Sequence, residues 1–469
     1  MGYLAFLAYT IAASVSAVAA TAGPRPNILL IVSDDHGYGD VGAYGCKDIP
    51  TPNLDSLARN GARFTNGYVS CSFCSPTRAA LLTGRYQQRF GHEFNPGPVL
   101  VPDKDIGLPR TETLFPQRLK TAGYRTGLIG KWHLGYEPDR HPMSRGFDEF
   151  FGFPGGAHSY VNSEATPGNP IMRGRERVIE NEYLTDAFGR EAAAFIDRQA
   201  KSPWFLYLAF NAVHGPMDAA KRYADRFPNL TGGRKTYATM LTSMDDAVGR
   251  VLARLRELKL EENTLIFFVA DNGGPESVNS SDNGPLRGSK GSAWEGGIRV
   301  PFMMQWKGRI PAGKVYDQPA IQIDFLPTAL AAAGITPQPE WKLEGVDLVP
   351  YLRGDKTGAP HDTLYWRFGE QMAVRRGDWK LVRSAGEQKD ERDEGNSRRS
   401  VAADPTGARL YHLGQDIGET TDLATREPAK VKELAAAWLA WNRQNVAPAW
   451  YPADTSRGSG PQKGRKKKN

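Results

Sequence analysis

The sequence predicts an α/β protein with a mostly parallel sheet sandwiched by helices, and a smaller C-terminal antiparallel sheet plus helix. The apolar runs at 27–32 (NILLIV) and 265–270 (LIFFVA) have strand length and are typical of strands covered on both faces. A long amphipathic helix is predicted at 237–258, and strands that alternate with helices favour a parallel sheet. After about Pro350, short strand patterns follow in close succession, which indicates an antiparallel sheet.

The predicted elements alternate along the chain, and Gly61 and Gly123 mark the ends of two helices. A charge-dense stretch at 387–400 is typical of a solvated loop. In order, the elements are a strand at 27–32, helices at 53–60 and 111–122, strands at 126–129 and 204–209, a helix at 237–258, strands at 265–270, 364–368, 371–374, 379–382 and 410–412, and a helix at 428–442.

Composition restricts the class of protein. With 469 residues, 24% charged and 40% hydrophobic, the chain is neither a disordered polypeptide nor a collagen-like repeat nor a multi-span membrane protein. The net charge is +7, but Lys463 and the four basic residues at 465–468 account for most of it. The rest of the chain is therefore nearly neutral, and no nucleic-acid partner is expected.

The N-terminus resembles an export signal. Residues 1–22 carry no charged side chain and end in small-x-small triplets of the kind that signal peptidases cut. We expect cleavage, a periplasmic or secreted protein, and no stable membrane span afterwards, with an uncleaved membrane anchor as the alternative. The predicted units are a signal peptide at 1–22, a catalytic domain at 23–355, a small α+β subdomain at 356–450 and a basic disordered tail at 451–469.

Two of the predicted strands run directly into acids and amides. Asp34 and Asp35 follow the strand at 27–32, and Asp271 and Asn272 follow the strand at 265–270. In a parallel α/β sheet, ligands bind outside the carboxyl ends of the strands. Four oxygen ligands suit a hard divalent cation, Ca²⁺ or Mg²⁺. Taken separately, each pair is also compatible with a turn or a helix cap.

The stretch CSPTRAALLTGR at 74–85 is the most specific signal in the chain. It resembles the signature of the type I sulfatases, in the alkaline-phosphatase superfamily, through Cys74, Pro76, Arg78 and the continuation at 79–85. The resemblance implies that Cys74 is oxidised to formylglycine (3-oxoalanine) by a separate formylglycine-generating enzyme. It also implies a Ca²⁺ ion held by residue 74 together with Asp34, Asp35, Asp271 and Asn272.

Further segments match the same family in the same order. They are the GKWHLG block at 130–135, an Asn-x-x-His segment at 211–214, the LRGSKG stretch at 286–291 and a C-terminal Leu-Tyr stretch at 410–423. The resemblance implies catalytic roles for Arg78, Lys131, His133, His214, Asp271 and Lys290 around residue 74. The lysines would supply charge to the sulfate, and His214 would protonate the leaving oxygen. His133 would then remove the proton that lets the aldehyde re-form.

Substrate recognition is expected in loops around this site. Hydrogen-bonding groups and an aromatic face favour a sulfated carbohydrate over a simple aryl sulfate. The family pattern has a serine or a similar polar residue after the Gly-Phe-Asp segment, and residues 154–158 offer no clear match to it. The candidate substrate-binding residues are His92, Asn95, His158, Arg287, Trp366 and Arg367.

Three other readings remain open at this point: an aryl sulfatase of broad specificity, a phosphodiester or phosphonate hydrolase of the same superfamily, and a non-enzymatic binder of anionic polysaccharide. The three cysteines are too few for a disulfide scaffold. Cys46 and Cys71 could still pair in an oxidising compartment, but their spacing does not require it.

Overall fold

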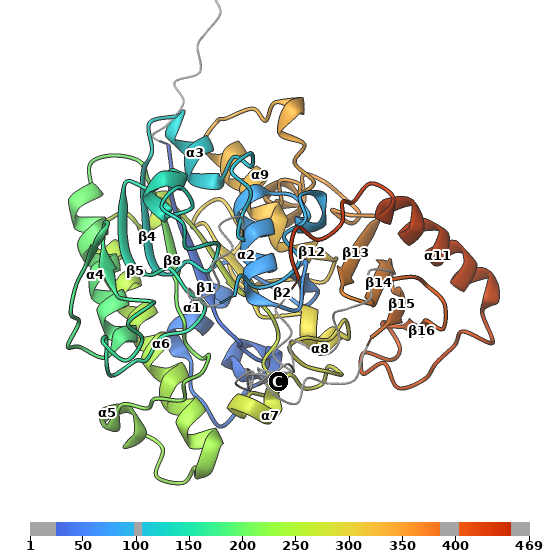
Figure 1. The fold of residues 1–469 in the computed structure, drawn as a ribbon, viewed down its shortest axis with the longest axis horizontal. Coiled ribbons are helices and arrows are strands. Elements are labelled where there is room, and N and C mark those ends of the chain that lie inside the picture. The colour runs from blue at the N-terminus through green and yellow to red at the C-terminus, as the bar shows by residue number, and fades with distance from the viewer. Residues whose placement is uncertain (1–24, 98–105, 385–402, 452–469) are drawn as a thin grey trace, which may run out of the picture.

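A computed structural model of the protein describes residues 25–97, 106–384 and 403–451, and it confirms the predicted α/β architecture (Figure 1). Within these residues the main sheet has ten strands in the order β11-β2-β10-β9-β1-β8-β4-β5-β6-β7. Strands β9, β1, β8, β4 and β5 are parallel neighbours. The bounds are β1 (Asn27–Ser33), β2 (Ala62–Phe64), β4 (Arg125–Lys131), β5 (Glu149–Phe153), β6 (Met172–Arg173), β7 (Glu176–Arg177), β8 (Trp204–Ala209), β9 (Thr264–Ala270), β10 (Phe302–Gln305) and β11 (Lys314–Tyr316).

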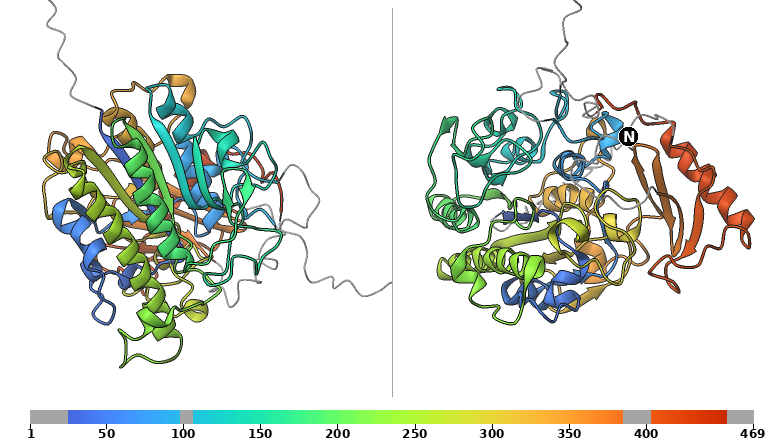
Figure 2. Two further views of the ribbon diagram at one scale, coloured as in Figure 1. Left: turned by 90° about the vertical axis from the view of Figure 1, so that its left-hand side faces the viewer. Right: turned by 60° about the horizontal axis from the view of Figure 1, so that its bottom comes forward.

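Helices cover both faces of this sheet, and Figure 2 shows α4 and α6 side by side over one of them. Along β1, Leu29 and Ile31 pack with α1, α4 and α6, whereas Leu30 and Val32 pack with α2, α3 and α9. Burial on both faces explains why the sequence of this strand is a continuous apolar run. The helices are α1 (Pro52–Asn60), α2 (Cys74–Thr83), α3 (Phe115–Lys120), α4 (Leu184–Gln199), α6 (Gly232–Glu257) and α9 (Phe325–Ala332).

Shorter elements connect these layers. They are β3 (Gly67–Tyr68), β12 (Ala320–Ile321), α5 (Lys221–Ala224), α7 (Glu276–Asn279), α8 (Glu295–Ile298) and α10 (Val349–Arg353). Strands β3 and β12 pair with each other in parallel, outside the main sheet.

Several boundaries differ from the prediction for physical reasons. The helix predicted at 111–122 begins only at Phe115, because Pro116 is suited to the first turn of a helix and not to its interior. Helix α4 was not predicted, and it carries Gly189 in its interior, which sequence rules count against a helix. A Cβ atom on Gly189 would lie 2.9 Å from Cβ of Ala247 in α6, so the glycine allows the two helices to approach closely.

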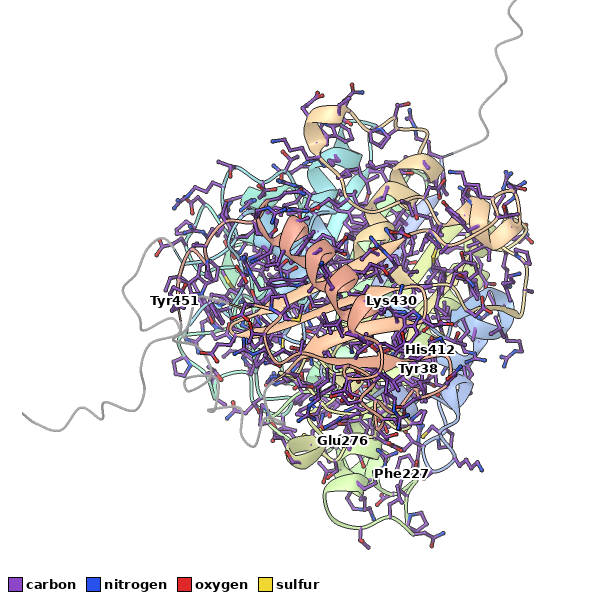
Figure 3. The ribbon with its side chains drawn as sticks, turned by 90° about the vertical axis from the view of Figure 1, so that its right-hand side faces the viewer. Tyr38, Phe227, Glu276, His412, Lys430 and Tyr451 are labelled. Atoms are coloured by element: carbon purple, nitrogen blue, oxygen red, sulfur yellow. The ribbon has the colours of Figure 1, made fainter. Side chains whose placement is uncertain are left out.

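The C-terminal unit is the predicted small antiparallel sheet with a helix. Its strands are β13 (Thr363–Phe368), β14 (Gln371–Arg376), β15 (Trp379–Arg383) and β16 (Arg409–His412), in that order across the sheet. Helix α11 (Pro428–Asn442) has the predicted bounds and lies across one face of the sheet (Figure 3). Trp438 of α11 is fully buried there, and its Nε1 donates to the carbonyl of Trp366 at 2.9 Å.

Some predictions concern residues outside the described ranges. These are the signal peptide at 1–22, the loop at 387–400 and all of the basic tail except Tyr451. Among the described residues, no helix has both the length and the apolar character that crossing a membrane requires. Cys46, Cys71 and Cys74 are free thiols, so Cys46 and Cys71 are not paired in this structure.

Candidate active site

Two parallel strands bring the predicted oxygen ligands to one edge of the sheet. Strands β1 and β9 are in register up to their last residues, where Ser33 lies opposite Ala270. Asp34 and Asp35 directly follow β1, and Asp271 and Asn272 directly follow β9. The backbone N–H of Asp35 donates to Oδ1 of Asp271 at 3.3 Å, and Nδ2 of Asn272 donates to Oδ1 of Asp35 at 2.7 Å. These four buried side chains therefore form one cluster.

The next two strands add the basic side chains. Strand β8 lies beside β1, and β4 lies beside β8, all with the same direction. Lys131 is the last residue of β4 and His133 follows two residues later, while His214 lies on the segment after β8. The carboxyl ends of four adjacent parallel strands thus meet at this site, as the position of ligand sites in α/β sheets predicts.

Cys74 reaches this edge from the start of helix α2. Its side chain is buried, and Sγ donates to Oδ1 of Asp34 at 3.5 Å. The next residue, Ser75, holds the start of the helix in place. Its backbone N–H donates to Oδ1 of Asn95 at 3.1 Å, and its Oγ lies 2.6 Å from both Nε2 of His92 and the carbonyl oxygen of His133.

Each of the three carboxylates is paired with a buried cation. Nζ of Lys131 lies 2.5 Å from Oδ2 of Asp34, and Nζ of Lys290 lies 2.8 Å from Oδ1 of Asp35. The guanidinium of Arg78 lies 2.8 Å from Oδ2 of Asp271 through Nη2. All these side chains are at most 3% exposed, so their charges act on one another with little screening by water.

The electrostatic environment shifts the pKa values of two neighbouring carboxyl groups, Asp35 and Asp271, in opposite directions. Burial opposes ionisation of Asp35, but the positive charges of Lys290 and His214 outweigh it and lower its pKa to about 2. Burial, together with the charge of Asp34, raises the pKa of Asp271 to about 6, although Arg78 acts in the other direction. Burial also raises the pKa of the Cys74 thiol well above its usual value and so disfavours the thiolate.

His133 is held in an unusual backbone conformation. Its φ of 61° is left-handed, a conformation that non-glycine residues adopt rarely, and Asp35 in the same cluster has a φ of 56°. Burial and the nearby charge of Lys131 lower its pKa well below the usual value, so the imidazole is neutral. A Cβ atom on Gly156 would lie 2.6 Å from Nε2 of His133, so glycine is required in the segment that covers this ring.

The donor set fits a divalent cation. Donor atoms of Asp34, Asp35, Cys74 and His214 all lie within 4.8 Å of one another. In addition, Oδ1 of Asn272 is buried and has no hydrogen-bond partner within the described residues. A buried amide oxygen left in this way, beside carboxylate oxygens, is the arrangement that a hard cation such as Ca²⁺ would satisfy.

The six candidate substrate-binding residues have different positions. His92 and Asn95 support the start of α2 behind Cys74, and His158 is buried, with Nδ1 2.8 Å from the carbonyl of Ser159. Arg287 stacks on Trp294, with its guanidinium carbon 3.9 Å from the ring centroid.

Trp366 and Arg367 both belong to β13 but face opposite sides of that strand. Trp366 is 2% exposed and donates through Nε1 to the carbonyl of Val69, so it packs between the two units. Arg367 pairs with Glu93 and also donates to Oδ1 of Asn442 at 2.7 Å.

Comparison with known families decides the identity of this fold. The Sulfatase family profile matches residues 26–335, which is more than half of the chain. The protein belongs to the sulfatase family. A second profile, described as the C-terminal part of N-sulphoglucosamine sulphohydrolase, matches residues 289–389. Membership makes the protein an enzyme of the alkaline-phosphatase superfamily that hydrolyses sulfate esters.

Several sulfatases resemble this chain over most of its length. N-acetylgalactosamine-6-sulfatase of Sus scrofa is 37% identical over 78% of this chain and 73% of its own. Arylsulfatase A of Homo sapiens is 34% identical over 93% of this chain and 91% of its own. The crystal structure of Ps i-CgsB in complex with k-i-k-neocarrahexaose has a TM-score of 0.83, with 34% identity, over 92% of this chain and 96% of that one.

The structure also shows supporting residues that the sequence did not reveal. Tyr207 on β8 accepts from Nη1 of Arg78 at 3.4 Å, and Ser75 and Gly156 contact His133 as described above. For Ser75 a signal existed, because it lies inside the family signature next to Cys74. Tyr207 lies inside an apolar strand run, where nothing in the local pattern distinguishes it from a core residue.

Proposed function

We propose that this sulfatase removes sulfate from a sulfated carbohydrate, with formylglycine made from Cys74 as the nucleophile and Ca²⁺ as the metal. The observation that carries this proposal is the buried cluster in which Cys74 lies against Asp34, with His214, Lys131 and Lys290 around the same carboxylates. Such a cluster concentrates positive charge and proton-transfer groups on one small anionic group, as hydrolysis of a sulfate ester requires.

Asp34, Asp35, Asp271 and Asn272, with the side chain of residue 74, would hold the Ca²⁺ ion. The unsatisfied Oδ1 of Asn272 and the carboxylate oxygens beside it support this assignment. The bound ion would act as a Lewis acid that withdraws negative charge from a sulfate oxygen. With formylglycine in place of the Cys74 thiol, every atom of this proposed ligand set is an oxygen, which is the reason to prefer Ca²⁺ or Mg²⁺ over zinc or copper.

Formylglycine at position 74 would supply an aldehyde whose hydrate offers an oxygen nucleophile in place of sulfur. A formylglycine-generating enzyme would have to act on Cys74 before or during folding, because the side chain is 1% exposed in the folded protein. The surroundings of Cys74 support an oxygen nucleophile, since its neighbours are carboxylates and ammonium groups.

The residues of the chain itself position the reactants and move protons. Lys131 and Lys290 direct two ammonium groups to the charge that develops on sulfate. His214, with Nε2 3.7 Å from Oδ2 of Asp35, is placed to give a proton to the leaving oxygen. His133 is neutral, so one of its ring nitrogens is an acceptor for the proton that must be removed, and its Nδ1 is buried without a hydrogen-bond partner among the described residues.

The substrate class rests on the relatives. One is named for a sulfated amino sugar, and a similar structure holds a carrageenan-type oligosaccharide. Arylsulfatase A covers more of this chain, which favours an aryl sulfatase of broad specificity as the second candidate. A phosphonate monoester hydrolase also shares the fold, at 20% identity and a TM-score of 0.62.

A substrate panel tests the proposal. Formylglycine-containing protein is incubated with sulfated galactosamine oligosaccharides, carrageenan oligosaccharides, nitrophenyl sulfate and a nitrophenyl phosphodiester, and released sulfate or nitrophenol is measured. We expect kcat/KM to be highest for one of the carbohydrates. A higher value for nitrophenyl sulfate than for every carbohydrate would favour the broad aryl sulfatase, and a higher value for the phosphodiester would overturn the assignment.

Export remains part of the proposal. Residues 1–22 would be removed as a signal peptide, so that the mature enzyme acts in the periplasm or outside the cell. N-terminal sequencing of the protein from its own host tests this, and an intact Met1 in the active enzyme would contradict it.

A further inference from the structure

The segment that carries Lys290 has little regular structure of its own. It runs from Arg287 to the start of α8 at Glu295 and contains Gly288 and Gly291, both with left-handed φ values of 81° and 85°. Its serine-rich backbone could adopt many conformations in isolation. Contacts from outside the segment must therefore fix the position from which Lys290 reaches Asp35.

One such contact comes from the C-terminal unit. Gln371, the first residue of β14, is 4% exposed. Its Nε2 donates to the carbonyl of Gly291 at 2.7 Å, and its Oε1 accepts from the backbone N–H of Ala293 at 3.1 Å. Oγ of Ser384 donates to the same Oε1 at 2.5 Å and so fixes the orientation of the amide. The amide of Gln371 thus contacts the backbone directly after Lys290 at two points, and Oγ of Ser384 is a second acceptor for the N–H of Ala293, at 3.0 Å.

A second group of contacts holds the two ends of the segment. The backbone N–H of Glu295 donates to Oε2 of Glu419 at 2.8 Å, and Nη1 of Arg287 donates to the carbonyl of Glu419 at 2.8 Å. Nζ of Lys380 lies 2.8 Å from Glu295 and 2.9 Å from Glu419, and all three of these side chains are fully buried. Glu419 and Lys380 belong to the C-terminal unit, which therefore holds the segment at both ends as well as in the middle.

The catalytic domain also contacts the backbone around Lys290, where Nδ2 of Asn283 donates to the carbonyl of Gly288 at 3.3 Å. The N–H of Gly291 donates to the carbonyl of Ser72 at 3.0 Å, and the N–H of Lys290 lies 3.5 Å from the carbonyl of Gly274. The first of these ties the segment to the residues just before Cys74. Gly291 is thus held from both sides, because its N–H bonds to Ser72 and its carbonyl accepts from the amide of Gln371.

We propose that Gln371 is a positioning residue for Lys290, so that the C-terminal sheet is part of the catalytic machinery. This role rests on the proposed function of Lys290 at the sulfate. Neither Ala nor a carboxylate can replace the amide, because one end must donate while the other accepts. A displacement of about 1 Å in a catalytic group costs roughly 10²-fold in rate, so loss of this contact should appear in kcat.

The primary test compares two glutamines. Gln371→Met removes the contact with similar side-chain volume. Gln88→Met is the matched control, because Gln88 is also buried and also joins the two units, through Nε2 to the carbonyl of Arg367 at 2.8 Å. We expect kcat for sulfate release to fall by about 10- to 100-fold in Gln371→Met. Gln88→Met should keep the wild-type kcat, although its melting temperature falls by about as much as that of Gln371→Met.

A double-mutant cycle separates positioning from a general structural effect. If Gln371 acts through Lys290, then in a Lys290→Ala background the change Gln371→Met should lower kcat by less than about twofold. Equal fold-losses in both backgrounds, or a kcat for Gln371→Met equal to that of Gln88→Met, would overturn the proposal. If Gln371→Met does not fold, Gln371→Glu replaces it, since it keeps the acceptor for Ala293 and removes the donor to Gly291.

Measurements on the wild-type enzyme separate a failure of the proposed function from a failure of the positioning role of Gln371. Wild-type enzyme that contains formylglycine and releases no sulfate from any substrate would overturn the proposed function, and this role with it. Active wild-type enzyme with an unaffected Gln371→Met variant would overturn the positioning role alone.

Discussion

Arg78 and Asp271 form a buried ion pair that joins helix α2 to the end of strand β9. Nη2 and Nε of Arg78 lie 2.8 and 2.9 Å from Oδ2 of Asp271, and neither side chain is exposed. Cys74 lies one turn before Arg78 on the same helix. The pair therefore helps to fix the distance between the proposed nucleophile at position 74 and the predicted metal ligands, which come from a different part of the chain.

Replacing Arg78 should impair both stability and turnover. Arg78→Met leaves the carboxylate of Asp271 without its partner, and breaking a buried pair in this way costs about 3–5 kcal/mol. Arg78→Lys keeps the charge but not the two-nitrogen contact, so we expect a smaller loss of stability and about 10²-fold lower kcat. Chemical denaturation and sulfate release are the measurements. Arg85→Lys is the control, because its pair with Glu112 is partly exposed, and a comparable loss there would contradict the account.

Cys74→Ala should abolish turnover and leave folding nearly unchanged. The substitution removes the proposed nucleophile but only one small buried group, so we expect about 1 kcal/mol of destabilisation. Cys71→Ala is the matched control, since Cys71 is also buried and lies three residues earlier. Sulfate release and the unfolding free energy are measured for both. Activity near the wild-type level in Cys74→Ala would remove this residue from the mechanism.

Ca²⁺ should stabilise the folded protein, and a chelator should stop turnover. A ligand present at 100 times its Kd adds about 2.7 kcal/mol to the unfolding free energy, which a thermal melt detects. In Asn272→Ala this gain should shrink, because the buried Oδ1 is lost. Asn283→Ala serves as control, since Asn283 is an equally buried amide that bonds the backbone of Gly274 instead. An unchanged Ca²⁺ effect in Asn272→Ala would contradict the assigned ligand.

The pair of His361 and Asp324 should make stability depend on pH. Burial opposes the charged imidazole, but Asp324, 2.7 Å away, outweighs it and raises the pKa of His361 above its usual 6.5. A raised folded-state pKa means that the stabilisation is fully present below about pH 6.5 and is lost as pH rises through the folded-state pKa. Relative to His361→Gln, the wild type should be about 1–2 kcal/mol more stable at pH 6. Urea denaturation across pH should show this difference vanish in alkaline buffer, and a constant difference would refute the pair.

The parts of the site that follow directly from strand ends could be predicted from the sequence. Asp34 and Asp35 follow one apolar run, and Asp271 and Asn272 follow another. Because parallel strands have their carboxyl ends at the same edge of a sheet, this order alone places the four side chains at one edge. The choice of Cys74 as a candidate also followed from the sequence, because the family signature is continuous there.

The contacts between distant segments could not be predicted in this way. Gln371 lies 80 residues from Gly291, and local periodicity does not show which side chain crosses between two units. Trp366 shows a limit of reasoning from residue type, because an aromatic ring in the predicted strand at 364–368 suggests a sugar-binding face but does not show which side of the strand it lies on. In β13 the buried residues alternate, and Trp366 lies on the side that packs against the catalytic domain.

Peptide mass spectrometry across residue 74, on active protein purified from its own host, tests directly whether Cys74 is converted to formylglycine. We expect that residue 74 has lost the sulfur and two hydrogens of cysteine and gained one oxygen, which is the composition of formylglycine. An unmodified thiol at position 74 in protein that releases sulfate at its full rate would contradict the account.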